Sequence, residues 1–297
     1  MTIARLGSFR RASELLHIAQ PALTRQMKRL ERQLGVDLFR RQGRNIVVTD
    51  AGQLLLQRGQ GLLDEFARTE ADVAARANVP SGIVSLGAAP SIAHILFAPV
   101  AARYRVLHPQ VEVRLYESVG HLWDWLSEGK LDIAILPNCE PSTNLPFKVR
   151  QVVKEQIYVV GRRDDVRMPR TPCSPADVLK LPLVISSHPN TARKWLDNYG
   201  TKVGAKPMVA VEADSLLLQH DLVAGGIGFA LLPHCALEAF FGDTAIEAVP
   251  VRDLMLSRTV AWRTDRPLTP AAKGMLDVIY EEVEKAEAAG KFGKPCR

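Results

Sequence analysis

Between Ser8 and Phe39 the chain reads SFRRASELLHIAQPALTRQMKRLERQLGVDLF, and this stretch decides how its N-terminal part folds. Ser8 is a good N-cap residue, so we expect a first helix from Phe9 to about Leu16. After a short turn a second helix is predicted from Gln20 to about Leu34, with a proline tolerated in its first turn and a glycine to end it. A short helix, a tight turn and a second helix in series have helix-turn-helix geometry.

The second helix of this stretch has two opposite faces when its residues are placed at about 100° intervals. The apolar face gathers Leu23, Met27, Leu30 and Leu34. The cationic face gathers Arg25, Lys28, Arg29 and Arg32, with Pro21 on it and with Gln20 and Thr24 at its flank. An apolar back holds such a helix on its domain, while arginine and glutamine can bond base edges and lysine can neutralise phosphates. We therefore expect this helix to enter the major groove of DNA.

The chain has 297 residues and a net charge of +6, and the excess charge is concentrated at one end. Residues 1–60 hold 11 lysines and arginines against four acidic residues, a net charge of +7, whereas the remainder carries −1. A small basic module ahead of a nearly neutral body is typical of a polyanion-binding head on a separate domain. The length agrees, since about 150 residues per domain predicts two or three domains.

A long helix is predicted from Asp50 to about Asn78. An apolar seam of the coiled-coil type runs along it through Leu55, Leu62, Phe66 and Val73. This pattern favours a dimerisation and linker helix. Gly59 and Gly61 weaken this case, because each costs about 1 kcal/mol in a helix interior. The alternative is an ordinary amphipathic helix that packs on its own domain.

Beyond Gly82 strands and helices alternate to the end of the chain. Examples are a strand at 83–86 followed by a helix at 91–107, and a strand at 183–185 followed by a helix at about 192–199. This rhythm predicts an α/β fold with mostly parallel sheets. About 215 residues are generous for one sheet, so we expect two α/β lobes.

The motifs resemble those of the LysR-type transcriptional regulators. In the head the resemblance is carried by a gap-free run from Gly7 to Gln26, and by Leu30-Glu31, Leu34–Arg41 and Val48–Gly52. In the body it is carried by Leu131–Ile135, Leu181–Leu183, Leu222–Gly228 and Leu232-Pro233. The resemblance covers essentially the whole chain. It implies a winged helix-turn-helix at 1–49, a linker helix at 50–80, and a two-lobed effector domain similar to periplasmic binding proteins at 81–297. Lobe I then takes about 81–155 and 258–297, and lobe II about 156–257.

The resemblance also implies roles for single residues and partners. The residues that approach base edges are Gln20, Pro21, Thr24 and Arg25. Lys28 and Arg29 lie toward the DNA backbone, and Arg44 in the wing reaches the minor groove. Thr24 stands where serine is commoner and keeps the hydroxyl. The implied partners are promoter DNA, a small effector, further copies of the chain in a homodimer or homotetramer, and RNA polymerase.

The start of the chain departs from the family pattern. Members usually carry about ten more residues before the segment that begins at Gly7, and these form most of a first helix. With only Met1 to Leu6 in front, we expect Leu23 and Leu30 to lose their cover, which is worth about 1.5–3 kcal/mol for each buried side chain. Two explanations stay open: the start is placed too late, or the head is impaired and the protein is an effector sensor that does not bind DNA.

The effector site is expected where strands end and helices begin, as in other open α/β sheets. Ser91 follows one strand and opens a helix whose first N–H groups attract anions, although it also fits a plain N-cap. The matching positions of the second lobe are Ser186 and Ser187, with Asn190 or Thr191 capping the next helix. The resemblance adds Gly226 and Ile227 from a crossover loop. An anionic effector, a carboxylate above all, suits this polar helix-start geometry.

Other classes of protein find little support in the sequence. An α/β enzyme is the alternative from another class, but G-x-S-x-G and H-E-x-x-H are absent and the seven histidines lack ligand spacing. We expect no cofactor and no metal. Four cysteines without a C-x-x-C pair predict reduced, buried thiols. The N-terminus lacks an apolar signal segment and the longest apolar run is shorter than the roughly 20 residues that span a bilayer, so a cytoplasmic protein without membrane association is expected.

Overall fold

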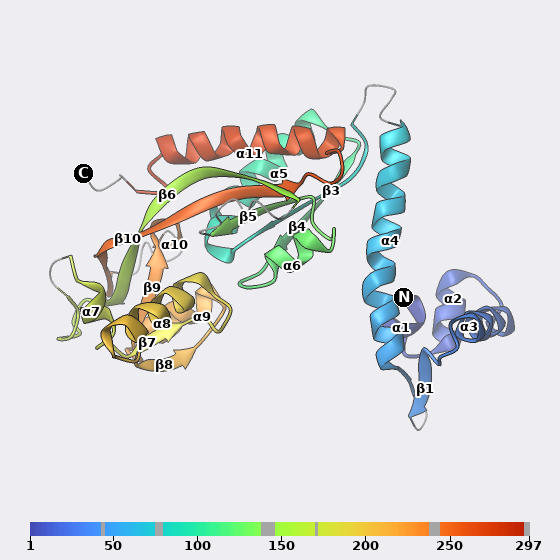
Figure 1. Ribbon diagram of the computed structural model, residues 1–297, viewed down its shortest axis with the longest axis horizontal. Coiled ribbons are helices and arrows are strands. Elements are labelled where there is room, and N and C mark those ends of the chain that lie inside the picture. Colours follow the sequence, from blue (N-terminus) through green and yellow to red (C-terminus); the bar gives the residue numbers. More distant parts are fainter. Residues whose placement is uncertain (43–44, 75–79, 138–145, 170–171, 238–243, 294–297) are drawn as a thin grey trace. The chain divides into compact units, whose positions relative to one another are not determined.

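The computed structural model describes residues 1–42, 45–74, 80–137, 146–169, 172–237 and 244–293. These residues form two compact units, Met1–Phe66 and Ala67–Arg297 (Figure 1). Each unit has its own hydrophobic core, so each is described by itself.

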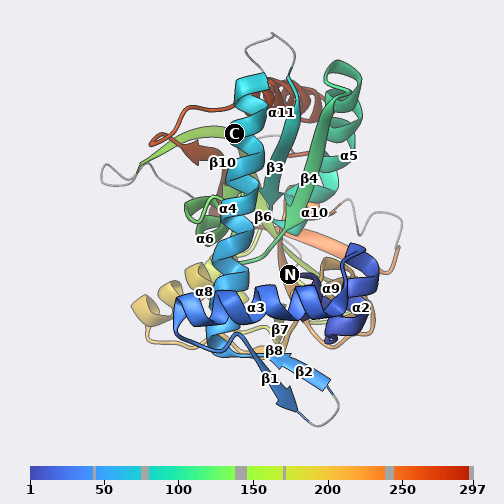
Figure 2. The same ribbon diagram turned by 90° about the vertical axis from the view of Figure 1, so that its right-hand side faces the viewer.

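The first unit begins with three helices, α1 (Thr2–Leu6), α2 (Phe9–Leu16) and α3 (Gln20–Leu34). The Ser8 hydroxyl accepts a hydrogen bond from the Arg11 N–H at 3.4 Å, which caps α2 as predicted. Gly35 ends α3 in the left-handed region at φ 70°. Both predicted helices are therefore confirmed, with the predicted bounds. The helices are completed by a two-stranded ribbon, β1 (Phe39–Gln42) and β2 (Asn45–Val48), which projects beyond α3 in Figure 2.

The core of the first unit corrects one expectation from the sequence. Leu23 is only 6% exposed, because Ile3 from the short helix α1 and Ala12 from α2 cover it. Leu30 is half-buried rather than uncovered. On the apolar back of α3, Leu23 is therefore buried, Met27 and Leu30 are half-buried, and Leu34 at the end of the helix is 47% exposed.

Helix α4 (Asp50–Ala74) confirms the long helix predicted after the ribbon, and residues 75–78 of that prediction lie outside the described residues. Thr49 starts α4 by accepting a hydrogen bond from the Gly52 N–H at 3.1 Å. Along the expected seam, Leu55, Leu62 and Phe66 are 37%, 72% and 64% exposed within this chain. The side chain of Val73 lies outside the described residues.

The second unit is built on one mixed sheet of eight strands in the order β4-β3-β5-β10-β6-β9-β7-β8. Their bounds are β3 (Gly82–Ala88), β4 (Val111–Glu117), β5 (Ile133–Pro137), β6 (Phe147–Arg162), β7 (Leu183–Ile185), β8 (Val209–Glu212), β9 (Phe229–Pro233) and β10 (Ile246–Arg263). Three strands at each end are parallel, and the long strands β6 and β10 join them as an antiparallel pair. The expected parallel sheets are therefore two halves of one sheet, whose centre is antiparallel.

Helices cover this sheet and define the two lobes. Their bounds are α5 (Pro90–Leu107), α6 (Leu122–Ser127), α7 (Pro175–Val178), α8 (Thr191–Val203), α9 (Leu216–Ala224), α10 (His234–Leu237) and α11 (Pro270–Ala288). Helices α5 and α11 lie together on one face of the sheet (Figure 1) and close a core around Leu86, Leu96 and Ile279. A second core around Ile157, Leu196 and Phe229 lies in the other lobe. Both lobes share β6 and β10, so a side chain on either strand stands between two cores.

Candidate functional sites

The exposed face of α3 carries the polar and cationic side chains expected to meet DNA. Gln20, Pro21, Arg25, Lys28 and Arg29 are exposed, and Thr24 is half-buried beside them. The Gln20 side-chain amide donates to the Thr24 hydroxyl at 3.1 Å, and this hydroxyl donates to the Gln20 carbonyl at 3.0 Å. The first turn of α3 therefore presents an ordered glutamine–threonine pair, with the arginines and the lysine one to two turns further on. Arg44 lies outside the described residues.

An acidic residue beside this face has a structural task. A shallow groove beside the C-terminal half of α3 brings the basic side chains of Arg25, Lys28, Arg29 and Arg32 together with Glu31 and Asp37. The Glu31 carboxylate accepts hydrogen bonds from the backbone N–H groups of Leu38 at 2.9 Å and Phe39 at 3.3 Å. Because Glu31 is occupied in holding the turn into the ribbon, it leaves the cationic side chains available to an external polyanion.

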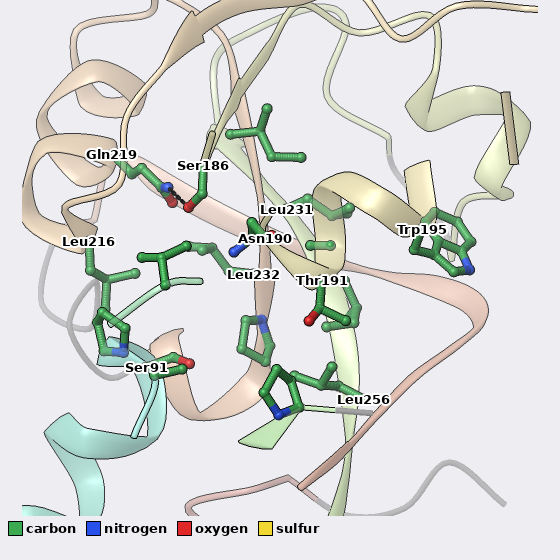
Figure 3. A pocket seen from close by; sticks show the side chains of 18 of the residues that line it. Ser91, Ser186, Asn190, Thr191, Trp195, Leu216, Gln219, Leu231, Leu232 and Leu256 are labelled. Atoms are coloured by element: carbon green, nitrogen blue, oxygen red, sulfur yellow. Dashed lines mark hydrogen bonds between the residues drawn. The ribbon is translucent and has the colours of Figure 1, made fainter. Parts of the chain in front are cut away.

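A pocket lies between the two lobes of the second unit, and Figure 3 shows it from close by. Ser91 approaches it from α5, Asn190, Thr191 and Trp195 approach it from the start of α8, and Gln219 lies on α9. Apolar side chains from the sheet and α9 line much of the remainder, among them Ile157, Leu216, Leu231, Leu232 and Leu256. The cavity measures about 100 Å³. A cavity of about 150 Å³ in another protein holds benzene, so this one suits a small molecule.

Ser91 is held in the pocket by a buried arginine. The N-cap of α5 is Ala89, which makes no side-chain capping bond, so the plain N-cap role considered for Ser91 is wrong. Instead the Ser91 hydroxyl oxygen accepts a hydrogen bond from Arg258 Nη2 at 2.8 Å. Arg258 comes from β10, and its side chain is 1% exposed. Ser91 and Arg258 therefore meet across the base of the pocket from opposite parts of the chain.

Arg258 forms a buried ion pair with Glu155 of β6. Arg258 Nε donates to Glu155 Oε1 at 2.6 Å, and the second carboxylate oxygen accepts from the Cys235 N–H at 2.9 Å. Burial by itself would lower the pKa of Arg258, but the adjacent Glu155 carboxylate outweighs it and the pKa is raised. Burial raises the pKa of the Cys235 thiol, whose sulfur lies 3.4 Å from Arg258 Nη2. The result is a fixed cation, since a buried charge of this kind is stable only with a partner.

The lobe II side of the pocket is organised by Gln219. Its side-chain amide donates to the Ser186 hydroxyl at 3.1 Å and to the Ala213 carbonyl at 2.6 Å. Asn190 caps α8, as one of the two expected residues, by accepting from the Arg193 N–H at 3.1 Å. Asp214 accepts two hydrogen bonds from Ser187, one from its N–H at 2.9 Å and one from its hydroxyl at 2.8 Å.

The structure gathers some of the expected effector residues and leaves others apart. Ser91 and Ser186 line the pocket, together with Asn190 and Thr191. Ser187 does not line it, because its hydroxyl is turned to Asp214. Gly226 and Ile227 lie past the end of α9, where Ile227 is 49% exposed, and neither reaches this pocket. Sequence reasoning missed Arg258, Trp195 and Gln219.

The described residues offer neither a metal site nor a membrane-spanning helix. No group of three or more histidine, cysteine, aspartate or glutamate side chains there has the geometry to hold a metal ion. Among the helices of the described part of the chain, none is long and apolar enough to cross a membrane. Two cysteines, Cys173 and Cys235, are free and buried as predicted, whereas Cys139 and Cys296 fall outside the described ranges.

A helix-turn-helix with a cationic front, joined to a two-lobed α/β domain with a pocket between its lobes, defines a ligand-responsive transcription regulator. Residues 1–53 match the family described as bacterial regulatory helix-turn-helix protein, lysR family. Residues 77–284 match the LysR substrate binding domain. The chain belongs to the LysR family of transcriptional regulators.

Curated relatives and solved structures agree with this assignment. The HTH-type transcriptional regulator BbuR of Bordetella bronchiseptica is 26% identical over 98% of this chain and 90% of its own length. A probable RuBisCO transcriptional regulator of Chlorokybus atmophyticus is 31% identical over 87% of this chain and 84% of its own. The fold is similar to that of full-length CbnR complexed with its target DNA, with a TM-score of 0.71 at 19% identity over 95% of this chain and 96% of that one.

Proposed function

We propose that this regulator binds promoter DNA sequence-specifically in the cytoplasm through α3 and the β1–β2 ribbon, and that a small anionic effector in the lobe pocket modulates this binding. The observation that carries the proposal is that one chain contains both an exposed cationic face on α3 and a pocket whose Ser91 hydroxyl is bonded by a buried cation, Arg258. The chain acts as a regulator rather than as an enzyme. The structural relative CbnR has been crystallised with its target DNA, which supports the same use of the head here.

In the head, we assign base contacts to Gln20, Pro21, Thr24 and Arg25, phosphate contacts to Lys28 and Arg29, and a minor-groove contact to Arg44. A mobility-shift assay on promoter fragments tests this sorting. Arg25→Ala should relax specificity at one base position, because a lost base contact costs discrimination of about 1–3 kcal/mol. Lys28→Ala should weaken all sequences alike and reduce the slope of log affinity against log salt by about 1. If both variants change specificity and salt dependence equally, the sorting is wrong.

In the body, we assign effector contacts to Ser91 and Ser186, which line the pocket, and we propose Ser187, Gly226 and Ile227, which lie outside its lining, as further effector contacts. Calorimetry of effector binding to Ser91→Ala tests the placement. The variant loses one hydroxyl at the pocket wall, so effector affinity should fall while the melting temperature of the protein changes little. Unchanged effector affinity would place the site elsewhere.

The assembly proposed is a homodimer through α4, or a homotetramer, that contacts RNA polymerase. The support on α4 is its exposed apolar side chains, since Leu62 and Phe66 are 72% and 64% exposed within one chain. Exposed apolar rows of this kind are typical of helix-to-helix interfaces. Analytical ultracentrifugation of Leu62→Asp should then show a smaller species than wild type, and an unchanged mass would remove α4 from the interface.

A further inference from the structure

We infer that the effector is a small monocarboxylate with a short apolar tail, and that Arg258 selects its charge by fixing the Ser91 hydroxyl as a hydrogen-bond donor. This inference rests on the proposed function and adds to it a chemical class and a positioning residue. It narrows the carboxylate expected from the helix-start geometry to a monocarboxylate with a short apolar tail. The positioning residue is new, because Arg258 comes from a strand on which no site residue was expected.

The first step concerns the Ser91 proton. A hydroxyl has one proton to donate and two lone pairs to accept with, whereas a guanidinium only donates. Because the Ser91 oxygen accepts from Arg258 Nη2 at 2.8 Å, its own proton must point elsewhere. Within the described residues no acceptor takes that proton, and Ser91 lines the pocket. The Ser91 hydroxyl is therefore presented to the pocket as a donor, polarised by the charge behind it.

The second step concerns the group of the effector that accepts a hydrogen bond from Ser91. Arg258 is the only basic side chain among the described residues that line the pocket. Glu155 holds it rigidly at 2.6 Å, so the guanidinium stays charged and does not turn away from Ser91. A carboxylate only accepts hydrogen bonds, and hydrogen bonds that involve an ionised group are roughly twice as strong as neutral ones. A carboxylate thus fits this end of the pocket better than an amide of the same shape, because the NH₂ group of the amide donates and would itself need an acceptor.

The third step concerns the number of carboxylates. On the lobe II side the only charged lining residue among those described is Asp214, a carboxylate that would repel a second one. The side-chain amide of Gln219 donates to the Ser186 hydroxyl at 3.1 Å and to the Ala213 carbonyl at 2.6 Å, so its own carbonyl oxygen remains as an acceptor. At this end a second carboxylate would meet the Asp214 carboxylate and the Gln219 carbonyl oxygen, and among the described lining residues only neutral hydroxyl and amide groups, those of Ser186, Asn190 and Thr191, could donate to it. One carboxylate is therefore the complement of the pocket.

The fourth step concerns the tail. Much of the remaining lining is apolar and includes Leu216, Leu231 and Leu232, which Figure 3 labels. Ile157, Trp195 and Leu256 line the pocket as well. Burial of a methylene group among such side chains is worth about 0.8 kcal/mol in transfer data, whereas an unpaired polar group there would be penalised. The cavity volume of about 100 Å³ limits the tail to roughly three to five carbons.

The test is calorimetry of the full chain with four matched probes. Isovalerate carries one carboxylate and a branched tail, isovaleramide is its neutral counterpart, succinate adds a second carboxylate, and leucine adds an ammonium group. We expect isovalerate to bind at least about tenfold more tightly than each of the other three, the effect of a charged hydrogen bond. Equal affinity for isovaleramide would overturn the charge selection. Tighter binding of succinate or leucine would overturn the single carboxylate or the apolar tail.

Variants separate a positioning role of Arg258 from a merely structural one. The double variant Glu155→Gln with Arg258→Gln removes both buried charges together and leaves no unpaired ion. It should bring the isovalerate-to-isovaleramide affinity ratio to within about threefold. A structural role would weaken both ligands and keep the ratio, which would overturn the inference. Ser91→Ala leaves the ion pair intact and should also bring the two affinities close together, which keeps the test valid if the double variant fails to fold. The control is Ser127→Ala. The Ser127 hydroxyl donates to the Trp123 carbonyl outside the pocket, so this variant should keep the wild-type ratio.

A mobility-shift assay with the same proteins keeps this inference distinct from the proposed function. Specific DNA binding without measurable isovalerate binding would overturn the inference and leave the regulator proposal standing. Isovalerate binding with the expected selectivity would support the inference whether or not DNA affinity changes. If isovalerate binds but leaves DNA affinity unchanged, the proposed modulation of DNA binding is contradicted.

Discussion

The head of this protein should depend on one buried leucine more than on any of its charges. Leu23 lies at the centre of the small core of α1, α2 and α3 and is 6% exposed. Leu34 lies on the same helix but is 47% exposed, so it offers a matched control of the same residue type. We predict that Leu23→Ala unfolds the head at a much lower temperature than wild type and that Leu34→Ala does not.

The magnitude follows from burial. Replacing a fully buried leucine by alanine typically costs about 2–5 kcal/mol, which includes the cavity left behind. In a domain of 60–100 residues each kcal/mol shifts the melting temperature by roughly 4–8 °C, so a fall of about 10–30 °C is expected. A half-exposed leucine loses only part of its transfer energy, and alanine is the better helix former, so Leu34→Ala should cost about 1 kcal/mol or less.

The two units can be followed separately in the full chain. All four tryptophans, Trp123, Trp125, Trp195 and Trp262, lie in the second unit, so tryptophan fluorescence reports that unit alone. Far-ultraviolet circular dichroism reports the helices of both. Leu23→Ala should lower the circular dichroism transition of the head and abolish DNA binding, while the fluorescence transition stays at its wild-type temperature.

Two results would refute this reasoning. If Leu34→Ala lowers the head transition as much as Leu23→Ala, exposure does not measure the contribution of these side chains. If Leu23→Ala leaves the head transition in place, then α1 does not form the cover that Ile3 provides in the structure.

Three further predictions concern single contacts. A Cβ atom at Gly52 would lie 2.2 Å from the Leu38 carbonyl oxygen, so Gly52→Ala should destabilise the head by about 1–3 kcal/mol, and an unchanged circular dichroism transition would contradict this contact. The Ser174 side-chain hydrogen bond, aided by Lys180, lowers the pKa of Asp177. The Asp177 carboxylate therefore stabilises the folded protein at pH values above its unfolded pKa, and this contribution is lost as the pH falls through the folded pKa. Ser174→Ala should raise this pKa in an NMR titration, and an unmoved value would refute the assigned cause. Because burial raises the pKa of Cys235, its thiol should resist alkylation until the protein unfolds, and rapid labelling of native protein would show that the site opens.

Local signals predicted the head well. The cap at Ser8, the stop at Gly35 and the helical spacing of Leu23 and Met27 are all short-range features, and helices α2 and α3 have the predicted bounds. What those signals did not predict was the cover of Leu23, because Ile3 reaches it through the packing of α1. A contact of that kind depends on tertiary structure, whereas the helix bounds depend on residues within a few positions.

The centre of the sheet was harder to predict. Strands β6 and β10 run over Phe147–Arg162 and Ile246–Arg263, and the alternation of strands and helices did not predict so long a pair at the centre of the sheet. Polar residues interrupt both strands and mask the β pattern, and their antiparallel pairing joins segments far apart in the chain. Parallel order was inferred from the alternation of strands and helices, which holds at the two ends of the sheet and fails at its centre.

The residue that completes the pocket nevertheless left a signal in the sequence. Leu254, Leu256 and Arg258 are buried along β10 and alternate with the less buried Met255 and Ser257. Alternation of this kind marks the inward face of a strand, so Arg258 occupies a core position, where arginine almost never stands without a partner. Val153, Glu155, Ile157 and Val159 repeat the pattern on β6, and Glu155 there is the opposite charge. Two opposite charges at inward positions of two alternating strands predict a buried pair. A buried pair that also reaches Ser91 in a pocket implies a use beyond stability, because apolar residues of similar volume would often hold the sheet equally well.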